Sequence, residues 1–589
     1  MSMNVKTAGN GDGSANGAAS RSVNATRDIP IEMLQALRAA VRDTPENPAS
    51  WRNLARAMRS SGDRTAASVL YARSITASTN DTELLRLEQS AKAGDVSALE
   101  GALESRLKNA PDDIVAMRLL ADHLVGSGRQ ERAEQHYRLA IDLCPSYLPA
   151  RHGMSKLLFE QARLEEAAIE SERMLATAPL DARARMLKAA IAASIGDNED
   201  AASLYSGLLA DQPEHPSLWL GLGHSHRILG RTDQAIKSYR KAAEHEVTGD
   251  ESRWCLANLK TFRFSDTEVG DLLKRANEEE PNGQKAVYIH FALGKHFHDL
   301  GKPVEAFDHF ERGNAAKRAM LNYDASVAEK RLDEWIGATA GPVEEVTGDE
   351  YRGSTPIFIV GLPRSGSTLL EQILGAHGSV EATAELPYLD SIAGRLSAAR
   401  LSSSNRGEGL FGHDLPSLGR EYLARARVHR KTAKPYFIDK LPGNFAHVGL
   451  IRRILPHAKI IDMRREGAAT LWSIYKQLFW RGHSFAYEQT EIARWYLAYD
   501  QAMRRFDDLY PGAIIRVKYE ALVRSPEAEV GAILEALGLP FDAACLRHHE
   551  HVGPIRTPSS DQVRRPIHME ALDEWHQYAD QLKLALALL

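Results

Sequence analysis

The stretch PIFIVGLPRSGSTLLEQILGA, residues 356–376, decides the fold of the C-terminal part of the chain. Its apolar run 357–360 predicts a buried strand, and residues 369–376 have the apolar spacing of a helix. A loop with two glycines, residues 361–368, joins the two elements. Free backbone N–H groups and the positive end of the helix dipole converge in such a loop. The stretch therefore predicts an anion-binding loop at one edge of an α/β sheet.

The identity of residue 367 limits which anions the loop is expected to bind. The loop resembles the triphosphate-binding pattern G-x4-G-K-[ST], but Ser367 stands where that pattern has lysine. That lysine contacts the β- and γ-phosphates of a nucleoside triphosphate. A 5'-phosphosulfate carries fewer charges and needs no bridging metal, and Arg364 can neutralise the phosphate that leaves. The alternatives are a decayed triphosphate loop and a chance glycine loop.

A second strand and helix supply further anion-binding residues. Residues 459–463 predict a buried strand, with Arg465 just beyond it and Ser473 in the helix that follows. An arginine and a hydroxyl eight residues apart, at a strand end and two turns into a helix, can hold one phosphate from two sides. This arrangement suits the 3'-phosphate of a nucleotide.

Three more segments carry polar residues that can reach the same place. Glu385 follows the first helix, Lys440 ends the predicted strand 437–440, and a polar segment at 559–566 precedes Trp575. Ligands of open α/β folds bind at the carboxyl ends of the parallel strands, where these segments can meet.

Together these motifs show that residues 356 to about 580 resemble the catalytic domain of tyrosylprotein sulfotransferases and their bacterial repeat-fused relatives. The resemblance implies a donor substrate, 3'-phosphoadenosine-5'-phosphosulfate, and no metal. It implies that Glu385 is the general base and that Arg364, Lys440 and Ser559 stabilise the transition state. The implied donor-binding residues are Arg364, Ser365, Gly366, Ser367, Thr368, Arg465, Ser473, Tyr519 and Ser560.

Two positions depart from the family pattern. Gln477 stands where a basic residue is expected one turn after Ser473, and Glu574 stands where one is expected before Trp575. Both changes reduce the positive charge around the donor. Arg564 and Arg565 are candidates to replace this lost positive charge.

The first half of the chain has a period of 34 residues. Small, aromatic and helix-stopping residues recur on it, as in a helix-turn-helix unit. The period is that of the tetratricopeptide repeat, which this region resembles. The series are Pro111, Pro145, Pro179 and Pro213; Ala133, Ala167, Ala201 and Ala235; and Gly128, Gly196 and Gly230, with Ala162 in the gap.

The predicted fold class is therefore multidomain, with an all-α tetratricopeptide-repeat solenoid followed by an α/β P-loop-like domain with a parallel sheet. We predict a disordered tail over residues 1–29, the solenoid over 30–340 and the catalytic domain over 350–589. The tail has no apolar core of a signal peptide and the chain no run that would span a membrane, so we expect a cytoplasmic protein.

Composition restricts the partners. A net charge of −5 gives no general attraction to nucleic acid. Three widely spaced cysteines, Cys144, Cys255 and Cys545, predict neither a disulfide framework nor a zinc site.

Three functions fit the sequence. The first is a sulfotransferase that acts on a protein or peptide, at tyrosine, with the acceptor held in the repeat groove. The second is a sulfotransferase for a glycan, lipid or small metabolite, with the repeats used for assembly. The third is an inactive repeat scaffold. The oligomeric state stays open, and the pairing of related catalytic domains makes a homodimer one expectation.

Overall fold

A computed structural model describes residues 29–93, 99–259, 261–343, 354–383, 385–402, 414–479, 482–550, 555 and 563–589. Its contacts divide the chain into two compact units, with the division between Met154 and Ser155. Apart from Ile29, the predicted tail lies outside the described residues.

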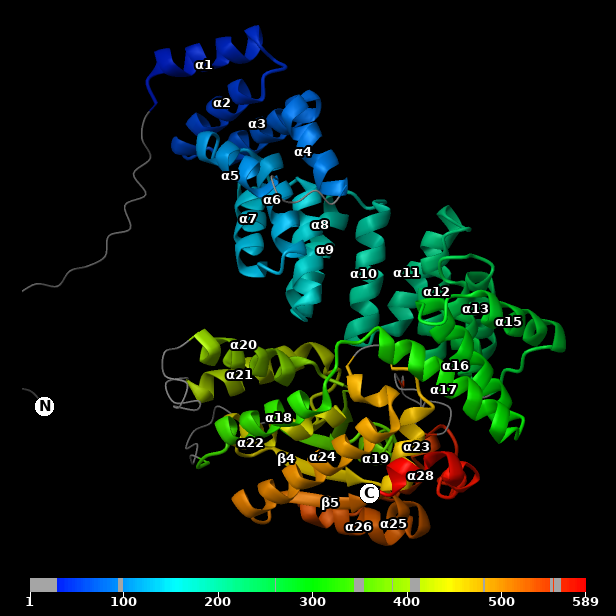
Figure 1. The fold of residues 1–589 in the computed structure, drawn as a ribbon. Coiled ribbons are helices and arrows are strands. Elements are labelled where there is room, and N and C mark those ends of the chain that lie inside the picture. The colour runs from blue at the N-terminus through cyan, green and yellow to red at the C-terminus, as the bar shows by residue number, and fades with distance from the viewer. Residues whose placement is uncertain are drawn as a thin grey trace, which may run out of the picture. The chain divides into compact units, whose positions relative to one another are not determined.

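The first unit is helical (Figure 1). Its elements are α1 (Ile31–Asp43), α2 (Pro48–Ser60), α3 (Arg64–Ala77), η1 (Ser78–Asn80), α4 (Thr82–Ala93), α5 (Leu99–Asn109), α6 (Ile114–Gly126) and α7 (Gln130–Leu143), and α8 (Leu148–Glu160) crosses the division.

The second unit begins with the later repeat helices. These are α9 (Leu164–Thr177), α10 (Ala182–Ile195), α11 (Asn198–Asp211), α12 (Pro216–Ile228), α13 (Thr232–Ala243), α14 (Gly249–Ala257), α15 (Asp266–Glu278), α16 (Gln284–Asp299), α17 (Pro303–Ala319) and α18 (Ala325–Thr339). Among the described helices of the chain, none combines the length and the apolar composition needed to cross a membrane.

The residues of the 34-residue period have the roles that the sequence predicts. The turn position is left-handed at Gly128, Gly196 and Gly230, and Ala162 adopts the same conformation with φ of 54°. The alanines of the second helices, such as Ala201 and Ala235, are fully buried. Small side chains there let the paired helices approach closely. The helical repeats therefore form as predicted.

The rest of the second unit contains the sheet. Its elements are β1 (Thr355–Gly361), α19 (Ser367–Gly375), β2 (Val380–Ala382), α20 (Tyr388–Ser402), α21 (Leu415–Ala426), η3 (Arg427–His429), β3 (Tyr436–Asp439), η4 (Pro442–His447), α22 (Val448–Ile454), β4 (Lys459–Arg464), α23 (Gly467–Tyr475), η5 (Ser484–Tyr487), α24 (Gln489–Leu509), β5 (Ile514–Lys518), α25 (Tyr519–Arg524), α26 (Pro526–Leu537), η6 (Ala543–Glu550), η7 (Glu574–Tyr578) and α28 (Ala579–Leu586).

In the described part of the chain, five strands form one parallel sheet in the order β2-β3-β1-β4-β5. Ile357 of the central strand pairs with Ile438 on one side and with Lys459 on the other. The predicted fold class, helical repeats followed by a parallel α/β sheet, is confirmed.

Both faces of the sheet are covered by helices, which explains the continuous apolar strands. Phe358 and Val360 pack with residues of α18, α20, α21, α22 and α24 on one face. Ile357 and Ile359 pack with residues of α19, α25 and α26 on the other face. Because helices cover both faces, a ligand can approach the sheet at the loops that follow the carboxyl ends of its strands.

Candidate active site

Each strand ends close to a residue that the sequence predicts for the site. Arg364 lies three residues after β1, and Glu385 three residues after β2. Lys440, Arg465 and Tyr519 directly follow β3, β4 and β5. Because the carboxyl ends of parallel strands share one edge of a sheet, these five residues are brought together.

They line one cavity of about 560 Å³. Four more predicted residues line the same cavity, Gly366, Ser367, Thr368 and Ser473. Ser365 is buried in the same loop, and its Oγ has no hydrogen-bond partner among the described residues. Ser559 and Ser560 lie outside the described residues.

The loop backbone is shaped for close approach. Arg364 has φ of 68°, a left-handed conformation that is uncommon and strained for a residue with a side chain. Gly366 has φ of 98°, and a Cβ atom there would lie 2.4 Å from the Tyr519 ring. Only glycine fits at this position, directly before the first turn of α19. Ser367 and Thr368 of that turn line the cavity, so the N-terminus of α19 lies where the sequence predicts an anion-binding loop.

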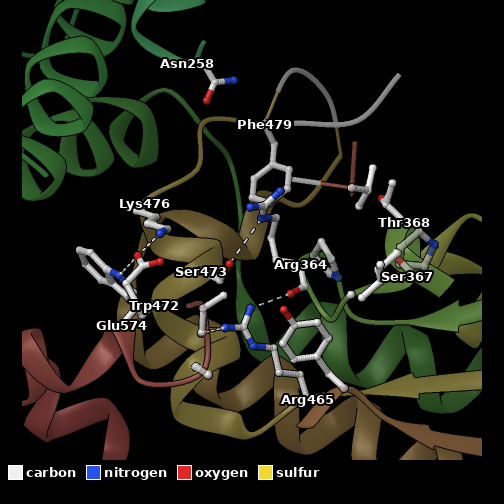
Figure 2. Close-up of a pocket in the computed structure, with 18 of the residues that line it drawn as sticks. Asn258, Arg364, Ser367, Thr368, Arg465, Trp472, Ser473, Lys476, Phe479 and Glu574 are labelled. Carbon is white, nitrogen blue, oxygen red and sulfur yellow. Dashed lines mark hydrogen bonds and ion pairs between the residues drawn. The ribbon is translucent and has the colours of Figure 1, made fainter. Parts of the chain in front are cut away.

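Two arginines and a serine form a cationic wall beside the loop (Figure 2). The Arg364 Nε atom donates to Ser473 Oγ at 3.4 Å, and Arg465 Nη1 donates to the Arg364 carbonyl at 3.2 Å. The Arg465 guanidinium lies 5.0 Å from the centre of the Tyr519 ring. Burial, and then the nearby Arg465 charge, lower the pKa of Arg364 to about 10, while the Glu574 carboxylate opposes this shift.

Glu385 and Lys440 form an ion pair at the mouth of the loop. The Lys440 Nζ atom donates to Glu385 Oε1 at 2.5 Å. The Lys440 side chain is 1% exposed, whereas that of Glu385 is 47% exposed. A second carboxylate, Glu371 of α19, lies 3.9 Å from Lys440 Nζ. Burial lowers the pKa of Lys440, but the two carboxylates outweigh burial, so the net shift is upward and the lysine is charged.

Asp439 connects the segments that carry this pair. It is fully buried at the end of β3, next to Lys440. Its Oδ1 accepts a hydrogen bond from the backbone N–H of Leu386, next to Glu385, at 3.3 Å. Its Oδ2 accepts from the Tyr422 hydroxyl at 2.7 Å. Asp439 is therefore a positioning residue for both members of the pair.

We expect Asp439→Ala to lower kcat by about 10-fold to 100-fold, because a small displacement of a reacting group is costly. The affinity of the cavity for a nucleotide such as 3'-phosphoadenosine-5'-phosphate should change little, since Asp439 does not line the cavity. Tyr422→Phe, which keeps the bond to Leu386, should have a much smaller effect. Steady-state kinetics of the two variants would check this, and equal losses would contradict the positioning role.

The structure shows a cation that the sequence reading missed. Gln477 is buried and donates to the Leu478 carbonyl, whereas Lys476 lines the cavity beside Ser473. Lys476 forms an ion pair with Glu574, which also lines the cavity. Of the two arginines expected to compensate, Arg565 lines the cavity and Arg564 does not. Arg564 donates instead to the Ile228 carbonyl of α12 at 2.9 Å.

Other basic residues of the sheet domain differ in whether they line the cavity. His483 lines the cavity. His447 accepts a hydrogen bond from Trp335 Nε1 and bonds to Asp390, and it is not among the residues that line the cavity. Arg395 pairs with Glu421 on the surface, Arg400 is not among the residues that line the cavity, and Arg481 lies outside the described residues.

The repeat helices also contribute to the cavity. His224 and Arg227 of α12 and Trp254 of α14 line it, with Asn258 just after α14. Figure 2 shows Asn258 on the repeat side of the cavity and Phe479 between it and Arg364. No local pattern marks these residues, since their role depends on the packing of the repeats against the sheet domain.

Comparisons with known proteins agree with this architecture. Residues 356–543 match the sulfotransferase family, and residues 191–250 match the tetratricopeptide repeat. An uncharacterised protein of Aquifex aeolicus is 28% identical over 56% of this chain and 45% of its own length.

Two further relatives are named as enzymes. Protein-tyrosine sulfotransferase A of Caenorhabditis elegans is 28% identical over 38% of this chain. Protein-tyrosine sulfotransferase 1 of Danio rerio is 30% identical over 37% of this chain. The matches span 63% and 65% of these relatives, so less than two thirds of each is covered.

Among solved structures, MamA is 19% identical to this chain, with a TM-score of 0.26. The match covers 28% of this chain and 96% of MamA. PilW is 16% identical to this chain, with a TM-score of 0.29. The match covers 40% of this chain and 92% of PilW.

The family matches agree with the repeat helices and the parallel sheet described above. The chain thus contains one region that matches the tetratricopeptide repeat and one that matches the sulfotransferase family.

Proposed function

We propose that this protein transfers a sulfuryl group from 3'-phosphoadenosine-5'-phosphosulfate to the hydroxyl of a protein or peptide tyrosine. One observation carries the proposal. A charged carboxylate–lysine pair, Glu385 and Lys440, lines the same cavity as an anion-binding loop that lacks the triphosphate lysine.

The donor fits the residues present. The first turn of α19 and Arg364 suit the 5'-phosphosulfate, and Arg465 with Ser473 suits the 3'-phosphate. Two buried polar atoms near the cavity, Ser365 Oγ of the loop and Arg465 Nε, have no hydrogen-bond partner among the described residues. Such atoms are expected where an anionic ligand completes the site.

In the proposed reaction the acceptor oxygen attacks sulfur, and the bond between sulfur and the oxygen of the 5'-phosphate breaks. Glu385 takes the proton of the attacking hydroxyl, which ends its charge attraction to Lys440. The Lys440 charge then becomes available to the developing negative charge, together with Arg364. The products are the sulfated acceptor and 3'-phosphoadenosine-5'-phosphate.

The acceptor class is supported by the relatives named protein-tyrosine sulfotransferases. The repeat residues in the cavity wall, such as Arg227 and Asn258, support contact between the acceptor and the repeats. The domain boundaries, the cytoplasmic location and the homodimer stay predictions from the sequence.

Transfer of labelled sulfate tests the acceptor. The full chain would be incubated with ³⁵S-labelled donor and a tyrosine-containing peptide, the same peptide with phenylalanine, a glycan or a simple alcohol. We expect label only on the tyrosine peptide. Label on the glycan or alcohol alone would overturn the acceptor class, and no label with any acceptor would favour the inactive scaffold.

A further inference from the structure

Among the described residues that line the cavity, Glu574, at the start of η7, is a second carboxylate besides Glu385. Its side chain is 24% exposed. Glu574 forms an ion pair with Lys476, which directly follows α23. In Figure 2 dashed lines join Glu574 to Lys476 and to Trp472, on the side of Ser473 away from the loop.

Two further donors hold this carboxylate. Trp472 Nε1 donates to Glu574 Oε1 at 3.0 Å, and His298 Nε2 lies 3.2 Å from the same oxygen. His298 belongs to the repeat helix α16, and its Nδ1 lies 2.8 Å from the Tyr578 hydroxyl. Burial raises the pKa of Glu574, but Lys476 and His298 outweigh burial and the net shift is strongly downward. The carboxylate is therefore ionised.

Lys476 is the matching cation. Its side chain is 16% exposed, and it lies three residues after Ser473, which also lines the cavity. Burial lowers the pKa of Lys476, and the positive charge of Arg364 lowers it further, while Glu574 opposes both. Lys476 is thus electrostatically coupled to Arg364, the arginine proposed to contact the 5'-phosphosulfate.

A bound phosphate and the Glu574 carboxylate would both be attracted to Lys476 and would therefore compete for it. A phosphate monoester carries about −1.5 to −2 charges at neutral pH. When it binds beside Ser473 and Arg465, it attracts Lys476 and repels Glu574. A carboxylate that already neutralises the lysine therefore lowers the affinity for a 3'-phosphate.

We propose that Lys476 and Glu574 are the specificity-determining pair for the 3'-phosphate, with Glu574 competing against that phosphate for Lys476. This inference rests on the proposed function, because it assumes that the donor nucleotide binds in this cavity. Glu574 stands where the family pattern has a basic residue, and Lys476 lies one position before Gln477, the other such position, so the pair departs from that pattern. Through His298, the repeat helix α16 holds the competing carboxylate in place.

The test is calorimetric titration of the full chain with two nucleotides that differ only in the 3'-phosphate. These are 3'-phosphoadenosine-5'-phosphate and adenosine 5'-phosphate. Glu574→Gln keeps the size and the acceptor oxygen but removes the charge. We expect it to raise the affinity for the bisphosphate by about tenfold and to leave that for adenosine 5'-phosphate unchanged.

Lys476→Met provides a second, independent variant. We expect it to lower the affinity for the bisphosphate by about tenfold and, again, to leave adenosine 5'-phosphate unchanged. Asp573→Asn is the matched control, because Asp573 adjoins Glu574 in sequence but has a side chain 86% exposed and does not line the cavity. It should change neither affinity.

The outcomes separate the two proposals. If the unmodified protein binds neither nucleotide, the proposed function fails and this inference fails with it. If it binds the bisphosphate but both variants shift the two nucleotides equally, or not at all, only the role of the pair is overturned. A Glu574→Gln variant that does not fold leaves Lys476→Met to decide, and unchanged preference in that variant would contradict the proposal.

Discussion

Glu385→Gln is expected to lower kcat by about 10²-fold to 10⁴-fold, the usual contribution of a general base. The amide has nearly the same shape but cannot take the proton of the attacking hydroxyl. Because Glu385 is half exposed at the mouth of the cavity, the fold should be unaffected. The dissociation constant of 3'-phosphoadenosine-5'-phosphate should also stay within about threefold of the original, since the proposed nucleotide contacts come from other residues.

The matched control is Glu421→Gln. Glu421 also forms an ion pair with a basic residue of the same part of the chain, Arg395, but does not line the cavity. Its loss should leave turnover unchanged. Single-turnover rates with labelled donor would compare the two variants, and a Glu385→Gln rate close to the original would remove Glu385 as the base.

Lys440→Met is expected to lower turnover by at least about 10²-fold, because a preorganised charge beside the transferring group is lost. This variant should also lose stability. Glu371 is buried, with its side chain 5% exposed, and it would lose the cation 3.9 Å away. Removing one partner of a buried pair costs on the order of 3 kcal/mol.

A double variant separates the two effects. Lys440→Met with Glu371→Gln removes both the lysine and the buried negative charge. We expect urea unfolding to show that much of the lost stability returns, while turnover stays low. Recovery of turnover together with stability would show that Lys440 acts only through the fold.

Much of the sheet domain could be predicted because its signals are local. The apolar runs at 357–360 and 459–463 lie within β1 and β4, and the glycines of the loop occupy left-handed or closely packed positions. The short strand β2, with three residues, has no periodic signal of its own and forms by pairing with β3. Tertiary pairing, not propensity, makes it a strand.

The cation Lys476 was missed for a different reason. The family pattern places the basic residue at 477, but α23 ends at Tyr475 and the helical spacing no longer applies beyond it. Chain geometry after the helix turns Gln477 to the Leu478 carbonyl and leaves Lys476 at the cavity. A residue just past a helix end cannot be assigned to a face from sequence period alone.

The residues that the repeats add to the cavity were beyond sequence reasoning. Arg227 and Asn258 lie more than a hundred residues before the loop, and the 34-residue period marks only packing positions. Their place in the wall depends on how α12 and α14 pack within the second unit. The same holds for His298, whose contact with Glu574 joins segments far apart in the chain.

The most direct measurement is calorimetric titration of the full chain with 3'-phosphoadenosine-5'-phosphate and with ATP, each with and without magnesium. A cavity that holds a sulfated nucleotide predicts stoichiometric binding of the bisphosphate without magnesium and much weaker binding of ATP under both conditions. Tight, magnesium-dependent binding of ATP, or binding of neither nucleotide, would contradict the account.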